Sequence, residues 1–252
     1  MDKEYYKDYY SLERKHWWFR AREAIIINTI HREIRPTRKL NILNVGCATG
    51  RSTEYLSAFG DVTTVEYDKD CCEFLLSEIG IKAINASATE LPFNSNTFDL
   101  VCAFDVIEHI EDHQLAVNEL CRVVKNEQFV FVTVPTYMSL WSKHDVINHH
   151  FRRYKMNELK SLFINNKDGV ITYNTYFNTI FFPLIWIARK LSNLIFRNKK
   201  EATSDFNNSD ENKISDKIFY SIFILEKRLL NHIRFPFGVS AMLIWKKNTN
   251  II

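Results

Sequence analysis

Short apolar runs alternate with amphipathic segments between residues 40 and 135. Apolar residues recur with helical spacing over 51–59, 69–78 and 114–124. The runs that we expect to form strands are LNILNVG (40–46), DVTTVEY (61–67), KAINAS (82–87), FDLVCAFDV (98–106) and QFVFVTVP (128–135). Strands that alternate with helices form βαβ units, so the pattern predicts a doubly wound, Rossmann-like α/β fold around a mostly parallel sheet.

The pattern is less regular on both sides of this region. KHWWFRARE and EAIIINTIHREI near the start predict a helical segment, and GVITYNTYF and GVSAMLIWKK near the end predict two more strands. The residues between those two strands predict a helical insertion that contains a mobile polar loop, RNKKEATSDFNNSDENK. We therefore divide the chain into an N-terminal segment (1–39), a core (40–176), an insertion (177–235), and a last strand with a tail (236–252).

The composition of the chain mainly excludes some partners and kinds of site. A hydrophobic content of 46% is ordinary for a globular protein, and a net charge of +3 is too small to predict a nucleic-acid partner. The five cysteines lack metal-binding spacing, which indicates reduced thiols, and the N-terminus has no apolar signal-peptide core. We expect a cytoplasmic protein.

The turn VGCATGRS, between the first strand and the next helix, predicts a nucleoside-binding site. Gly46 and Gly50 allow a ligand to approach the main chain, and Glu66, at the end of the next strand, can accept hydrogen bonds from both ribose hydroxyls. Alternatively, the glycines only shape the turn. Arg51 occupies the third glycine position of the dinucleotide fingerprint, which disfavours an NAD-linked oxidoreductase.

Together, ILNVGCATG, VTTVEYD and ATELPFNSNTFDLVCAFDVIEHI resemble the class I S-adenosylmethionine-dependent methyltransferases. The flanks resemble a bacterial branch, of the type 11/23 kind. The resemblance implies a seven-stranded sheet with an antiparallel last strand, and S-adenosyl-L-methionine as the cofactor. Asn44 and Ser87 replace acids that are usual in the family, which keeps a non-catalytic, cofactor-binding or partner-binding protein as an alternative. The cofactor-binding residues that the resemblance implies are Asn44, Gly46, Cys47, Gly50, Glu66, Tyr67, Ser87, Ala88 and Asp105.

Methyl transfer requires alignment of the acceptor and, for some acceptors, removal of a proton. His109, in DVIEHI, is a candidate general base because an unperturbed histidine has a pKa near neutrality; a structural histidine is the alternative. His150 is a second candidate. With Arg152, Arg153 and Tyr154 it matches the H-x-R-R-Y pattern of the family, so these three residues either bind an anionic group of the acceptor or hold their loop by ion pairs.

We expect no metal, since the histidines of this second motif have no acid at ligand spacing. Trp17 and Trp18, beside Arg20 and Arg22, are candidates for a lid over the cofactor with an arginine facing the methionine carboxylate, or for an aromatic helix packed on the sheet. Segment 179–196 is strongly apolar, but its uninterrupted apolar run, Thr179 to Ala188, is too short to span a bilayer. It predicts either a buried cap over the acceptor or an interfacial helix that makes peripheral membrane contact. The expected acceptor is a small molecule, lipid-linked, quinone-like or glycan.

Overall fold

The computed structural model describes residues 3–195 and 214–249. Its sheet has seven strands in the order β3-β2-β1-β4-β5-β7-β6, and β7 runs antiparallel to both of its neighbours. The other neighbouring strands pair in parallel, which confirms the predicted fold class. The strands are β1 (Leu40–Val45), β2 (Gly60–Glu66), β3 (Ala83–Asn85), β4 (Phe98–Phe104), β5 (Val124–Pro135), β6 (Gly169–Phe177) and β7 (Ser240–Lys247).

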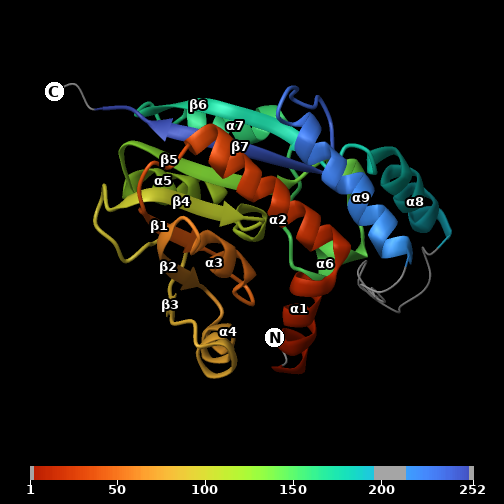
Figure 1. The fold of residues 1–252 in the computed structure, drawn as a ribbon, viewed down its shortest axis with the longest axis horizontal. Helices are drawn as coiled ribbons and strands as arrows, with labels where there is room; N and C mark the ends of the chain where they lie inside the picture. The colour runs from red at the N-terminus through yellow and green to blue at the C-terminus, as the bar shows by residue number, and fades with distance from the viewer. Residues whose placement is uncertain (1–2, 196–213, 250–252) are drawn as a thin grey trace.

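Helices cover both faces of this sheet (Figure 1). Alternate residues of β1 belong to different cores: Ile42 packs in a cluster with α2 and α9, and Leu43 in a cluster with α5 and α7. This alternation is expected for a strand that is buried on both sides. The helices are α1 (Lys3–Lys15), α2 (Trp17–Thr29), α3 (Arg51–Leu56), α4 (Lys69–Phe74), α5 (His113–Val123), α6 (Lys143–Ile147), α7 (Met156–Ile164), α8 (Phe182–Ile195) and α9 (Ile214–Leu229).

The expected strands are all present, with shifted ends. β5 begins at Val124 rather than at residue 128, because the backbone becomes extended directly after α5. The sequence pattern did not predict α1 as a helix. The polar stretch 197–213, expected to be a mobile loop, lies outside the described residues.

The insertion packs against the N-terminal helices rather than on the sheet alone. The ring of Trp17, at the start of α2, lies 5.3 Å from that of Phe181 and 5.4 Å from that of Phe219, centroid to centroid. Segments 200 residues apart in the sequence thus form one wall of the molecule, where α2 and α9 lie side by side (Figure 1). Within the described ranges, no helix has the length and apolarity that a bilayer span requires.

Candidate active site

A cavity of about 1180 Å³ opens at the carboxyl ends of the parallel strands. Its walls come from the β1–α3 turn, the ends of β2 and β4, the start of α2, the α6 region and α8. Parallel strands end at one edge of a sheet, so residues that follow β1, β2 and β4 meet there. This edge is where ligands bind in open α/β folds.

The two glycines of the β1–α3 turn are required by the turn itself. Gly46 has φ +69° and Gly50 has φ +88°, a region that other residues rarely adopt. A Cβ on Gly46 would lie 2.5 Å from Cγ2 of Val106, and one on Gly50 would lie 2.8 Å from Cδ1 of Ile81. Gly46 lines the cavity and Gly50 does not. The alternative explanation, that glycine shapes the turn, therefore accounts for Gly50.

Glu66 is held by the main chain at the end of β2. Its Oε2 accepts a hydrogen bond from the Ala48 N–H at 3.0 Å, and its Oε1 accepts one from the Asp68 N–H at 3.1 Å. Burial raises the pKa of the carboxyl group, and the backbone donors oppose that rise. The carboxylate lines the cavity in a fixed orientation, with lone pairs left for further donors.

Most of the other predicted cofactor residues line the same cavity: Cys47, Tyr67, Ser87, Ala88 and Asp105. Asn44 does not. Its Nδ2 donates to the hydroxyls of Ser52 at 2.8 Å and Thr53 at 2.9 Å, so this buried side chain ties β1 to α3. The expectation that Asn44 contacts a ligand has no support in its position.

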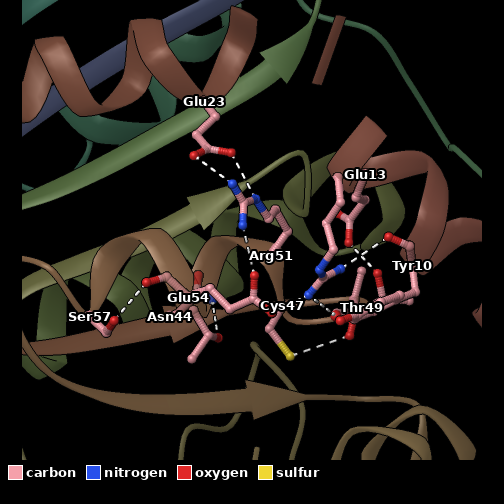
Figure 2. Close-up of polar contacts among 12 residues, drawn as sticks. Tyr10, Glu13, Glu23, Asn44, Cys47, Thr49, Arg51, Glu54 and Ser57 are labelled. Carbon is pink, nitrogen blue, oxygen red and sulfur yellow. Dashed lines mark hydrogen bonds and ion pairs between the residues drawn. The ribbon is translucent and has the colours of Figure 1, made fainter. Parts of the chain in front are cut away.

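The N-terminal helices are fastened to the β1–α3 turn by ion pairs (Figure 2). The Nε and Nη2 atoms of Arg51 donate to the two carboxylate oxygens of Glu23 on α2, at 2.8 and 2.9 Å. Glu54 accepts from Arg51 at 2.9 Å and also pairs with Arg14 on α1. Arg51, which stands where the dinucleotide fingerprint has its third glycine, therefore joins the turn to α2.

Arg22 connects the same helix to the end of β4. Its Nη2 lies 2.8 Å from the Asp105 carboxylate and 2.8 Å from the Thr133 hydroxyl. Its Nε is buried and has no hydrogen-bond partner among the described residues. Arg22, Trp17 and Trp18 all line the cavity, which supports the lid arrangement expected for this segment.

The far end of the cavity contains His109 and His150, whose ring centroids lie 4.5 Å apart in a T-shaped arrangement. The groups packed around His109, together with the neighbouring His150, lower the pKa of His109 to about 4, although the residue keeps surface open to the cavity. This pKa lies below the near-neutral value from which the role as a base was inferred. Glu108, which was not among the predicted site residues, lies beside both rings, and its carboxyl is fully buried.

The arginines of the H-x-R-R-Y motif hold their loop. Arg152 donates to the main-chain carbonyls of Ile110 and Glu111 and does not line the cavity. Arg153 lines it but is almost fully buried, with its Nε 2.7 Å from Asp145. The Tyr154 hydroxyl hydrogen-bonds to His113 at 2.7 Å. These contacts are those of the structural alternative, in which the motif holds its loop, and a substrate-binding role for the three residues stays a prediction.

Comparison with known proteins points to one kind of domain. The family model described as a methyltransferase domain matches residues 43–132, which include the β1–α3 turn, Glu66 and His109. This part of the chain is therefore similar to a methyltransferase domain, and the match supports the predicted resemblance to the class I S-adenosylmethionine-dependent methyltransferases. It also supports S-adenosylmethionine as the cofactor.

Individual relatives of the chain are distant. A "Probable S-adenosylmethionine-dependent methyltransferase" of Mycobacterium tuberculosis is 26% identical over 159 residues, 61% of this chain and 56% of that protein. The "Ubiquinone biosynthesis O-methyltransferase, mitochondrial" of Dictyostelium discoideum is 26% identical over 174 residues, 57% of this chain and 53% of that one. The chain thus spans about half the length of the curated relatives that it matches.

A solved structure shares the fold of the chain. The [4+2]-cyclase SpnF superposes with a TM-score of 0.56 at 14% identity, covering 91% of this chain and 81% of SpnF. At that identity the likeness concerns the fold alone. SpnF is described as a cyclase, so the chemistry must be argued from the residues of the site.

Proposed function

We propose that this chain transfers a methyl group from S-adenosylmethionine to a small-molecule acceptor. The observation that carries the proposal is the Glu66 carboxylate, oriented by two backbone N–H groups at the edge where β1 and β2 end. An acid at this position binds the ribose hydroxyls of a nucleoside. The alternative of an NAD-linked oxidoreductase is disfavoured because the space near the turn that a third glycine would leave open is occupied by the Arg51–Glu23 pair.

The residues around Glu66 fit the cofactor. The unpartnered Nε of Arg22 offers a charged donor suited to the carboxylate of a methionine moiety. Tyr67, Ser87 and Ala88 lie on the wall near β2 and β3, where an adenine would pack. When bound, S-adenosylmethionine supplies a methyl group that its sulfonium already activates, so the protein must chiefly orient the acceptor.

The acceptor end suits a hydroxyl group. The lowered pKa of His109 keeps its ring neutral at physiological pH, with a lone pair that can accept a hydrogen bond from the hydroxyl of the acceptor. The same lone pair can accept the proton, as the general-base hypothesis requires. His150 lies against the His109 ring and fixes its position.

The walls favour an apolar acceptor. Trp17, Trp18, Phe104 and Ile185 line the cavity and offer apolar surface to an acceptor, among the polar groups of the same walls. A relative is named as an O-methyltransferase of ubiquinone biosynthesis. We therefore favour a phenolic, quinone-like acceptor over a glycan.

Helix α8 offers a route for such an acceptor. Ile185, Ala188 and Arg189 line the cavity, while Leu184, Trp186 and Ile187 are exposed. We propose that this outer face makes peripheral contact with a lipid surface. Phe181 belongs to neither face, because it is buried against Trp17.

The membrane proposal has a direct test. Wild-type protein should float with anionic liposomes, and a variant with Leu184, Trp186 and Ile187 replaced by Ser should not. A wild-type protein that stays in the bottom fraction of the gradient at every lipid composition would leave α8 as a buried cap.

The catalytic proposal is tested with S-adenosylmethionine that carries an isotope in its methyl group. The protein is incubated with catechols with and without a prenyl chain, and products are measured by mass spectrometry. We expect labelled product and S-adenosylhomocysteine in equal amounts, with the prenylated catechol preferred. Tight binding of S-adenosylmethionine without product from either class would favour the non-catalytic alternative. A thermal shift with NAD and none with S-adenosylmethionine would contradict the cofactor assignment.

A further inference from the structure

Three side chains with metal-binding groups meet at the acceptor end of the cavity. Glu108 and His109 belong to the short turn Ile107–His109 after β4, and His150 belongs to the loop after α6. One ligand atom from each of the three lies within 4.8 Å of the other two. The two segments are joined by a hydrogen bond of 2.8 Å from the Phe151 N–H to the carbonyl of Glu108. The cluster is therefore fixed by the backbone of both segments.

The carboxyl group of Glu108 lacks hydrogen-bond partners among the described residues. Its side chain has no exposed surface, and neither carboxylate oxygen has a hydrogen-bond partner among the described residues. An unpaired carboxyl group in a protein interior costs free energy, and a bound cation or donor relieves that cost. Glu108 is among the residues that line the cavity, so an ion held by the two histidines would lie next to its carboxyl group.

His150 is oriented in the way that metal-binding histidines usually are. Its Nδ1 donates to the Oδ1 of Asp145 at 2.8 Å, which leaves Nε2 with the lone pair. Asp145 is itself held by Arg153 at 2.7 Å and by the Ser142 N–H at 2.8 Å. A carboxylate that fixes the far nitrogen of a histidine is the typical outer shell of a metal site.

We propose that Glu108, His109 and His150 bind a divalent transition-metal ion of the zinc class. Two imidazoles and one carboxylate are ligands that zinc prefers, whereas Mg²⁺ prefers oxygen. Zinc bonds of about 2.0–2.2 Å would draw the three groups together, and three protein ligands would leave a position open toward the cavity. The proposal goes beyond methyl transfer and rests on it in one respect: an acceptor oxygen would occupy the open position. With the ion bound, the lone pair of His109 would bind the ion instead of the acceptor hydroxyl.

Metal binding is measured on the full chain without cofactor or acceptor, so that it is independent of methyl transfer. The probes are Zn²⁺ in equilibrium dialysis and Co²⁺ by its visible absorption. We expect one tightly bound ion per chain, which millimolar Mg²⁺ does not displace. Glu108→Gln and His150→Gln should each weaken binding more than about 100-fold. Asp145→Asn, which alters only the outer shell, should weaken binding about 10- to 100-fold.

The matched control is His149→Asn, one residue from His150. His149 has a positive φ, which Asn tolerates, and it lies outside the cluster. This variant should bind Zn²⁺ as the wild type does, and ions held by cysteines would be equal in all variants. S-adenosylmethionine affinity, measured by calorimetry, should be unchanged in all four variants and reports on the proposed function separately. Equal metal binding by wild type and Glu108→Gln, or displacement of the ion by Mg²⁺, would overturn the proposal.

Discussion

Two carboxyl groups line the same cavity, and their surroundings differ. Glu66, at the cofactor end, accepts hydrogen bonds from two backbone N–H groups. Glu108, at the acceptor end, is fully buried, and neither of its carboxylate oxygens has a partner among the described residues. Burial raises the pKa of both groups; backbone donors oppose the rise at Glu66, whereas the neighbouring Asp105 adds to it at Glu108.

This difference separates two kinds of site. The main chain completes the surroundings of Glu66 before any ligand arrives, so its geometry depends mainly on the fold. The Glu108 carboxyl is a buried polar group whose oxygens lack hydrogen-bond partners among the described residues. Groups of this kind concentrate where a protein binds a ligand or reacts. The cofactor end is preorganised, whereas the acceptor end is completed by what binds to it.

The largest effect should come from His109, at the acceptor end. His109→Gln keeps a polar side chain but removes the imidazole, and should lower turnover by roughly 10²–10⁴-fold, whether the ring accepts a proton or orients the acceptor. Steady-state kinetics with calorimetry for S-adenosylmethionine would show unchanged cofactor affinity. Near-normal turnover would mean that the acceptor needs no assistance from this end of the cavity.

Stability should respond in opposite directions to the same substitution at the two carboxyl groups. In metal-free protein, Glu108→Leu removes an unpaired polar group and should raise the free energy of unfolding by about 1–3 kcal/mol. Glu66→Leu leaves the N–H groups of Ala48 and Asp68 without acceptors and should lower it by a similar amount, about 1–3 kcal/mol. Urea denaturation measures both. Destabilisation by both changes would refute the contrast.

Acid should loosen the lid over the cofactor end through His16. This buried residue caps α2, because its Nδ1 accepts from the Trp18 N–H at 3.1 Å. Burial lowers the pKa of His16 to about 4, below the ordinary value of about 6.5. As pH falls from about 6.5 to about 4, the unfolded chain therefore binds a proton that the folded chain does not, and stability falls.

The measurement is urea denaturation at pH 7 and at pH 4.5. At pH 4.5 the unfolded chain has bound a proton at this histidine that the folded chain largely excludes, so the part of the loss due to His16 should reach about 2 kcal/mol. His16→Asn retains a capping oxygen without a titrating group and should lose less stability over this range. Identical pH dependence of the two proteins would show that His16 does not contribute.

The smallest effect should be at the clamp between Arg51 and Glu23. The pair is partly exposed, and such pairs contribute about 0.2–1 kcal/mol. A double-mutant cycle with Arg51→Ala and Glu23→Ala should return a coupling energy in that range. Coupling near zero would show that the two side chains do not cooperate in holding α2 to the turn.

The sequence predicts the cofactor end well because its determinants are local. A strand, a glycine turn and an acid at the end of the next strand are close in sequence, and their order already fixes the sheet edge on which they meet. Glu66 and Gly46 line the cavity as expected. Asn44 and Gly50 do not line the cavity, because the exact placement of a residue depends on packing partners that the pattern does not specify.

The acceptor end was harder to predict because it is assembled from distant segments. Glu108 and His109 adjoin in sequence, but His150 reaches them only through the loop that Asp145, Arg152 and Arg153 hold. The sequence around His150 has no acidic residue at metal-ligand spacing. In the folded chain Glu108, which lies 42 residues earlier, supplies that carboxyl group. The lowered pKa of His109 likewise depends on the groups packed around it, which a motif does not reveal.

The central claim is that Glu66 binds the ribose of S-adenosylmethionine, and titration calorimetry tests it most directly. Glu66→Ala removes an acceptor of two hydrogen bonds and should weaken binding by about 2–3 kcal/mol, or roughly 30- to 150-fold. Glu108→Gln, at the other end of the cavity, serves as the control and should bind as tightly as the wild type. Unchanged affinity in a folded Glu66→Ala protein would contradict the assignment of the cofactor to this end of the cavity.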